Sequence, residues 1–361
     1  MSQEFTTRLQ LQLREAALRE ERRAPLAQRL VRARRGLPGP APLAAALAVA
    51  LLALAVAIGV LQLHGESEPT KPKVIHQFKA ADNLLSLSGG FGAVWATDPV
   101  SSQVLRIDPR TRKVTAHIRL SGEVQAVAGA GAVWALSGDL LTAGAQGAVE
   151  VTRIDPHTNR VVARIPMRSP RGDNFAPLFI TADDEHVWVI GAAGALRIDP
   201  ATNVRDRFVA YEQGGGTVAE ADRVWTLLTD GRLREIDART GRRVRDVQLH
   251  VPQDSHLIPG PPGFLTLAGP TSLTEIDRNT GATLWRAELG DDVLAGSFDG
   301  DSLWVHVSRA PDGPDRLVRL DPDTGRHLAQ VALADTDAVA LALIGRDVWI
   351  ADPGGTIIVV R

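Results

Sequence analysis

One unit of about 40 residues recurs along the chain from residue 73 onward, and this repetition constrains the fold more than any other feature. Residues 93–120 are the clearest copy: an apolar run containing Trp, an alternating run, a turn of the form Asp-Pro-x-Thr-x and a second alternating run. Residues that favour strands flank residues that favour turns, so each copy predicts three β-strands. The apolar run occurs seven times in all, with Leu265 in the place of Trp in one copy. The Trp residues of the other six copies are Trp95, Trp134, Trp188, Trp225, Trp304 and Trp349.

Six turns of the same kind begin at Asp108, Asp155, Asp199, Asp237, Asp277 and Asp321. Five of them carry Gly or Asn at the fifth position, whereas the first carries Arg112. Gly and Asn tolerate a positive φ, so the pattern predicts a left-handed residue at this position. We therefore expect a local conformational cost at Arg112.

The count of units predicts how the domain closes. There are seven Trp-type runs but only six Asp turns, because the last unit ends at Arg361 before its outer strand. Residues 73–80 match the missing strand. A strand from the other end of the domain would complete the last sheet and protect its edge. The sequence thus predicts an all-β domain over residues 73–361, a seven-bladed β-propeller closed by an N-terminal strand.

The N-terminal part differs in composition. Residues 1–40 hold nine Arg and four Glu, a formal charge of +5, which leaves −7 for the rest of the chain. Apolar residues at helical spacing predict that this Arg-rich segment is helical, and its Arg residues predict that it is cytoplasmic. Two interpretations stay open: a solvated helix before a membrane anchor, or an amphipathic segment that meets a partner or the membrane surface.

An apolar stretch follows the Arg-rich segment. Residues 41–63 contain 19 uncharged apolar residues from Leu43 to Leu61, which is the length of a transmembrane helix. The stretch is longer than the apolar region of a signal peptide, so we expect an uncleaved anchor. The preceding Arg residues place the N-terminus in the cytoplasm. Residues 64–72 are a polar linker, and the predicted protein is a single-pass cell-membrane protein with an extracytoplasmic propeller.

The repeated phrase x-V-W-x-x…L-x-R-I-D-P-x-T-x-x-V resembles bacterial seven-bladed propellers of the streptogramin-lyase-like and YVTN-repeat kind, over residues 73–361. The matching residues are those that build blades: the Trp is expected to pack between sheets, and Arg or Glu before the Ile-Asp step to form a ladder. The resemblance implies, for a lyase, a His acid/base acting with Mg²⁺. His306 follows Trp304 by two residues and is predicted to pack between blades, and no His falls at the mapped channel positions.

Propeller geometry maps candidate ligand-binding positions. The start of each inner strand and the end of the next strand lie on one face near the central channel. Counting from the Trp positions, the polar candidates on one arc are Asn83, Asp98, Asp292, Asp337 and Asp352. Of these, Asp98, Asp337 and Asp352 could hold a hard cation such as Ca²⁺ or Mg²⁺. The alternative is that Asp and Asn simply favour loop–strand junctions.

Composition excludes several classes of function. The chain has no cysteine, which excludes disulfides, thiolate metal sites and a catalytic thiol. A basic patch is expected only in residues 1–40, so no nucleic-acid partner is predicted. We therefore expect a membrane-anchored extracytoplasmic propeller that binds a small molecule or a protein, as a sensor or scaffold. The alternative function is a metal-dependent lyase or hydrolase of the streptogramin-lyase-like kind.

Overall fold

The computed structural model describes residues 71–138, 149–167, 175, 177–211, 214–220, 222–251, 255–258, 264–298, 300–308, 313–333 and 338–361. The helices predicted over 1–40 and 41–63 lie outside these residues. Within the described part, no helix has the length and hydrophobicity needed to cross a membrane. The all-β prediction for the rest is confirmed, because the described residues form strands and turns.

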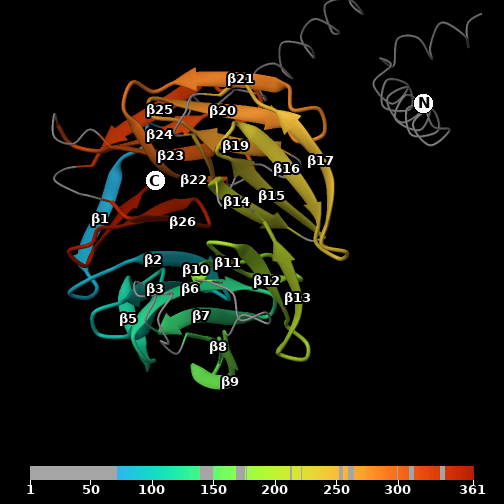
Figure 1. Ribbon diagram of the computed structural model, residues 1–361. Helices are drawn as coiled ribbons and strands as arrows, with labels where there is room; N and C mark the ends of the chain where they lie inside the picture. Colours follow the sequence, from blue (N-terminus) through green and yellow to red (C-terminus); the bar gives the residue numbers. More distant parts are fainter. Residues whose placement is uncertain are drawn as a thin grey trace, which may run out of the picture. The chain divides into compact units, whose positions relative to one another are not determined.

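Seven antiparallel four-stranded sheets follow one another around a ring as the blades of a propeller (Figure 1). Blades 1 to 3 consist of β2 (Ser86–Gly90), β3 (Ala93–Asp98), β4 (Gln103–Asp108) and β5 (Lys113–Arg119); β6 (Glu123–Gly129), β7 (Ala132–Gly138), β8 (Glu150–Asp155) and β9 (Arg160–Pro166); β10 (Pro177–Ala182), β11 (Val187–Gly191), β12 (Gly194–Asp199) and β13 (Val204–Ala210). Blades 4 to 6 consist of β14 (Gly214–Glu220), β15 (Arg223–Leu228), β16 (Arg232–Asp237) and β17 (Arg242–Gln248); β18 (His256–Ile258), β19 (Phe264–Ala268), β20 (Ser272–Asp277) and β21 (Thr283–Glu288); β22 (Asp292–Phe298), β23 (Leu303–Ser308), β24 (Arg316–Leu320) and β25 (His327–Ala332). Blade 7 consists of β26 (Ala340–Ile344), β27 (Asp347–Ala351), β28 (Thr356–Val360) and β1 (Val74–Lys79).

The ring closes as predicted. Strand β1 pairs antiparallel with β28, from Val74 opposite Val360 to Lys79 opposite Thr356. The main-chain amide of Lys73 donates to the carbonyl oxygen of Arg361 at 2.9 Å, which extends the ladder by one residue. The first strand of the domain therefore completes the last blade and covers its edge.

The six repeated Trp side chains form the interfaces between blades, which we call seams. Each is at most 6% exposed and belongs to an apolar cluster shared with the next blade. Their packing role is therefore confirmed. In blades 1, 2, 3 and 6 the guanidinium of the paired Arg stacks over the indole of the same blade, at 5.1–5.9 Å from the ring centroid. This stacking buries the Arg stem and adds a cation–π attraction.

The Asp turns are built as the sequence predicts. In the first turn, Oδ1 of Asp108 accepts hydrogen bonds from the main-chain amides of Arg110 and Thr111 at 2.7 and 3.0 Å. These bonds, that from Thr111 first, lower the pKa of the Asp108 carboxyl. The fifth residue has a positive φ in all six turns, including 56° at Arg112. The expected strain at Arg112 therefore exists in the backbone.

Blade 5 departs from the predicted alignment. Trp95 of blade 1 pairs with Arg106, and the corresponding pair in blade 5 is Thr266 with Glu275. Leu265 instead pairs with Ile276, as Val94 pairs with Ile107 in blade 1. The Trp position is thus occupied by Thr266, and the predicted equivalence of Leu265 is wrong by one residue. A shift of one residue matters because it moves a side chain to the other face of the sheet.

Every outermost strand carries a β-bulge. The register shifts once in the outer pair of each blade, and the residue left unpaired is exposed in several of them, such as Val162, Val244 and Leu284. A bulge twists an edge and interrupts its free hydrogen-bonding groups. The exposed apolar side chains on the rim therefore lie on outer strands whose edges the bulges protect from pairing with another strand.

Candidate functional site

The mapped positions do lie at one end of the inner strands. The start of each inner strand pairs with the end of the second strand, as in Pro177 with Gly191 and Asp292 with Ser308. Neighbouring inner strands contact each other around the channel, as β2 does with β6 and with β26. Hydroxyl groups join two of them: Oγ of Ser86 accepts from the amide of Ala126 at 3.2 Å. These strand starts form the mouth of the channel on one face.

Asp98 serves its own turn. Its side chain is 1% exposed, and its carboxylate accepts hydrogen bonds from the Ser101 amide at 2.9 Å and from Nε2 of Gln103 at 3.3 Å. A buried carboxylate with two such donors is satisfied by the turn that follows β3. In the structure, Asp98 therefore stabilises the turn that follows its own strand.

The other predicted site residues occupy different environments. Asp292 is exposed at the first position of β22, Asn83 is half-buried ahead of β2, and Asp352 is half-buried directly after β27. Asp337 lies outside the described residues. Across the described part of the chain, no group of three or more His, Asp and Glu side chains is arranged to hold a metal ion. Because Asp337 is one of the three predicted ligands, the cation site stays a prediction.

A histidine stands at the channel mouth, which corrects the sequence mapping. The inner strand of blade 5 begins at His256, which pairs with Ala268. Counting back from Leu265 by the spacing used for the other blades places this start at Gln253 instead, three residues before His256. His256 is half-buried. The mapping failed here because it assumed a constant distance between the inner strand and the Trp position.

His306 is buried in blade 6, as predicted. Its side chain and that of Asp315 are each 2% exposed, and Nε2 of His306 lies 2.6 Å from Oδ2 of Asp315. Burial lowers the pKa of His306, while the hydrogen bond and charge of Asp315 oppose that shift. The pair therefore holds a fixed imidazole in the blade rather than at an accessible surface.

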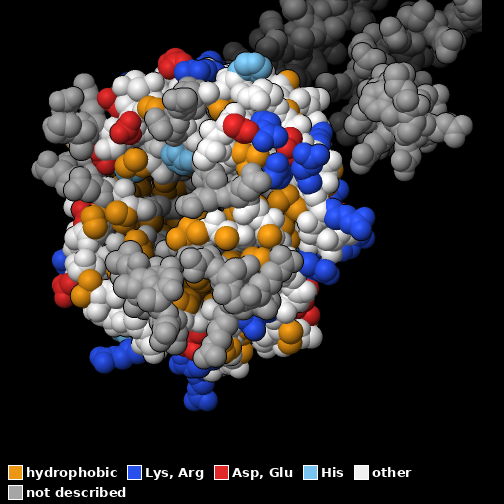
Figure 2. All heavy atoms as spheres, in the orientation of Figure 1, with side chains coloured by type: hydrophobic (Ala, Val, Ile, Leu, Met, Phe, Trp, Pro, Cys, Tyr) orange, Lys and Arg blue, Asp and Glu red, His pale blue; other side chains and the backbone are white. Residues whose placement is uncertain are grey.

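Large apolar side chains form the most distinctive feature of the channel mouth. Figure 2 shows hydrophobic side chains gathered around the hollow at the centre of the ring. Five of the large hydrophobic residues that are exposed lie at or near the starts of inner strands, from four blades: Leu85 (37%), Leu178 (44%), Phe179 (38%), Leu294 (49%) and Val339 (42%). We call this set the apolar collar. The sequence mapping selected polar residues and missed it, although these residues stand beside the mapped positions.

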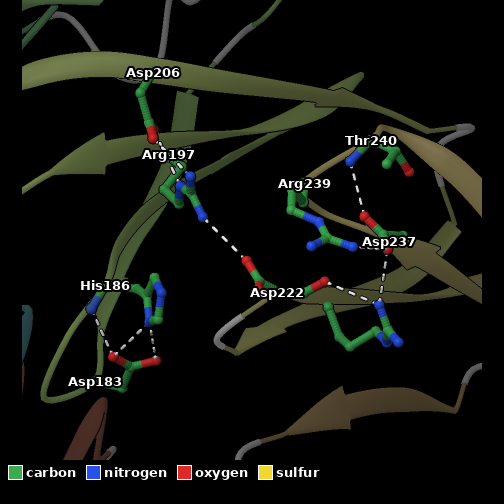
Figure 3. Close-up of polar contacts among 9 residues, drawn as sticks. Asp183, His186, Arg197, Asp206, Asp222, Asp237, Arg239 and Thr240 are labelled. Carbon is green, nitrogen blue, oxygen red and sulfur yellow. Dashed lines mark hydrogen bonds and ion pairs between the residues drawn. The ribbon is translucent and has the colours of Figure 1, made fainter.

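The opposite face carries polar clusters between the turns (Figure 3). Arg197 binds Asp206 of its own blade through Nε and Nη2, at 3.1 and 2.6 Å, and Asp222 of blade 4 through Nη1 at 3.3 Å. These carboxylates, Asp206 first, raise the pKa of Arg197. His186 contacts Asp183 at 3.2 Å within one turn. The contact of Arg197 with Asp222 links blades 3 and 4 by charge, in addition to the apolar cluster around Trp188.

Comparisons with known proteins support the fold alone. No family model matches the chain, and no curated protein matches it. Among solved structures it is similar to the computationally designed Ika8 protein, with a TM-score of 0.56 and 13% identity over 78% of this chain and 96% of that chain. At this identity the likeness shows a propeller and says nothing of a ligand. The resemblance to lyase-like and YVTN-repeat propellers is not confirmed.

Proposed function

We propose that this chain is a membrane-anchored, extracytoplasmic binding module that takes an apolar ligand or an apolar segment of a protein at the channel mouth. The observation that carries the proposal is the apolar collar. Exposed apolar side chains gathered in one concave place mark interaction sites more often than scattered ones do. The anchor rests on the apolar residues 43–61 and the Arg residues before them.

The chemistry of the collar favours binding over catalysis. Leucine, valine and phenylalanine supply area that is released from water when a partner covers it, at about 25 cal/mol per Å². None of them transfers protons or binds a metal. The lyase or hydrolase alternative would use the half-buried His256 or the predicted cation ligands. It would therefore depend on polar residues of this face and not on the apolar collar.

The collar can be tested with a neutral apolar dye such as Nile red. Replacing Phe179 and Leu294 by Ser should strongly reduce the fluorescence of the bound dye. The matched control replaces Val162 and Val244 on the outer strands, which are 55% and 48% exposed. Equal dye binding by the wild type and the collar variant would contradict the proposal, as would an equal loss in the control.

The predicted cation site has a separate test. If Asp98, Asp337 and Asp352 surround Ca²⁺ or Mg²⁺, the metal stabilises the fold by mass action, by about 2.7 kcal/mol at a hundred times the dissociation constant. The double change Asp98→Asn and Asp352→Asn should remove this dependence. Identical melting temperatures of the wild type with EDTA and with added metal would refute the site.

The predicted membrane topology has its own test. Reporter fusions after residues 35 and 361 should lie on opposite sides of the membrane.

A further inference from the structure

A basic pocket lies in the seam between blades 7 and 1, on the face opposite the channel mouth. It has a volume of about 530 Å³. Its walls come from the first Asp turn, which supplies Arg110 and Arg112, and from blade 7, which supplies Ile344, Arg346 and Arg361. The turn between β26 and β27 and the end of β28 bring the blade 7 residues to this seam.

The pocket holds an excess of positive charge. Arg361 is paired, because its Nε and Nη2 donate to the two carboxylate oxygens of Asp347 at 2.6 and 2.9 Å. Among the described residues, Arg110, Arg112 and Arg346 form no salt bridge, although the Asp108 carboxylate acts on Arg110 from within the turn. Four guanidinium groups thus line the space with Asp347 as the carboxylate among its walls. Uncompensated charges of one sign in a concave site attract a ligand of the other sign.

Arg112 provides two further observations. It adopts φ 56° at the turn position where the other five copies of the repeat have Gly or Asn. Its Nε is buried and has no hydrogen-bond partner. A residue held in an unfavourable backbone conformation, with a buried donor left unsatisfied, lowers stability. Both features are accounted for if the guanidinium is placed for a ligand that accepts from it.

This seam is open because blade 7 lacks a side chain that other blades have. In blade 2, Arg153 crosses the seam and donates to the Pro200 carbonyl of the next turn at 2.7 Å. In blade 5, Trp285 does the same with the Pro322 carbonyl at 2.8 Å. The positions equivalent to these two residues in blade 7 carry Val359 and His76. No side chain from the described part of blade 7 bonds to the blade 1 turn, and the space beside that turn stays free.

We propose that this pocket binds a phosphate-type oxyanion, either free or as the headgroup of an anionic phospholipid. A guanidinium presents parallel N–H donors that match the oxygens of such a group, and charge-assisted bonds of this kind are about twice as strong as neutral ones. Arg110, Arg112 and Arg346 supply donors that no carboxylate occupies. Ile344 adds an apolar wall beside them. The site is independent of the function proposed for the channel mouth.

The test titrates the full chain with inorganic phosphate at constant ionic strength and measures binding by calorimetry. We expect saturable binding by the wild type, weakened about tenfold in Arg346→Gln, which corresponds to about 1.4 kcal/mol. Arg112→Gly should weaken binding to a similar degree and at the same time raise the melting temperature, because Gly relieves the positive φ. If Arg112 had a purely structural role, its replacement would weaken phosphate binding and lower the melting temperature together.

The matched control is Arg239→Gln, the position equivalent to Arg110 in the turn of blade 4, which should bind phosphate like the wild type. A second arm uses phosphatidylcholine vesicles with and without an anionic phospholipid. Binding of free phosphate alone assigns a soluble ligand, and preference for the anionic vesicles assigns a lipid headgroup. Absence of saturable binding in both arms would overturn the proposal. So would unchanged binding in both Arg112→Gly and Arg346→Gln.

Discussion

Blades 2 and 5 fill the same position of the repeat with opposite chemistry. In blade 2, Trp134 is fully buried and the guanidinium of Arg153 lies 5.1 Å from its ring centroid. In blade 5 the equivalent residues are Thr266 and Glu275, and the Thr266 hydroxyl donates to Oε2 of Glu275 at 2.8 Å. The two seams have the same backbone register, so the comparison shows that the fold does not require an indole at this position of the second strand. The seam between blades 5 and 6 takes its indole from Trp285 of the outer strand instead.

The two seams should respond differently to pH. An Arg keeps its charge at all ordinary pH values. Glu275 is 1% exposed, and burial raises the pKa of its carboxyl to about 7, although the bond from Thr266 acts in the other direction. Its Oε1 is buried without a hydrogen-bond partner. The seam between blades 5 and 6 is therefore most stable when Glu275 is neutral.

The largest effect is expected when the apolar packing between blades 2 and 3 is disrupted. Trp134→Ala removes a fully buried indole and should lower the free energy of unfolding by about 3–5 kcal/mol. Thr266→Ala removes one methyl group and one hydroxyl at the equivalent position, so a loss of only about 1 kcal/mol is expected. Denaturant unfolding of the two variants at one pH measures the difference. Similar losses would mean that the Trp position is not the centre of each seam.

The second prediction concerns the pH dependence of the seam between blades 5 and 6, where Glu275 lies. The folded pKa of Glu275 is about 7 and the reference value is 4.5. Its contribution to stability is therefore fully present below about pH 4.5 and is lost as the pH rises through about 7, by about 3 kcal/mol in total. Glu275→Gln should abolish this loss, and denaturant unfolding at about pH 5 and about pH 8 measures it.

The readout has to be the difference between variant and wild type at each pH. Burial lowers the pKa of His306, so this residue adds stability that is lost as the pH falls, opposite in sign to Glu275. Glu275→Gln leaves His306 in place, and the subtraction isolates the carboxyl. A variant whose pH profile runs parallel to that of the wild type would show that Glu275 titrates normally.

The sequence predicted the fold well because its repeat marks strands directly. Trp95 and its counterparts, the Asp108 turn and the strand at residues 73–80 are each local patterns, and each appears in the structure as expected. Register was harder to predict. Thr266 takes the Trp position and His256 starts its strand three residues late, because loop lengths differ between blades and a single sequence does not reveal which residues pair.

The candidate sites show the same limit. The strained position of Arg112 was visible as an exception to the repeat, but the pocket beside it also depends on Val359 and His76 lying where other blades have long donors. That requires the pairing of β28 with β1. The apolar collar was missed because exposed Leu and Val cannot be told from buried ones by residue type alone.

The smallest expected effect sharpens the comparison between the seams. Thr266→Val keeps the shape of the side chain and removes the hydroxyl that donates to Glu275. This donor favours the ionised carboxylate, so its loss should raise the pKa of Glu275 further and shift the pH-dependent loss of stability to higher pH. At about pH 8 the variant should be about 1–2 kcal/mol less stable than the wild type, and at about pH 5 the difference should be smaller. The same change in the Glu275→Gln background should show no dependence on pH, because no ionisable partner is left. A pH-dependent effect of Thr266→Val in that background would mean that the hydroxyl acts on another group. The pair of Thr266 and Glu275 would then not explain the pH dependence of stability at this seam.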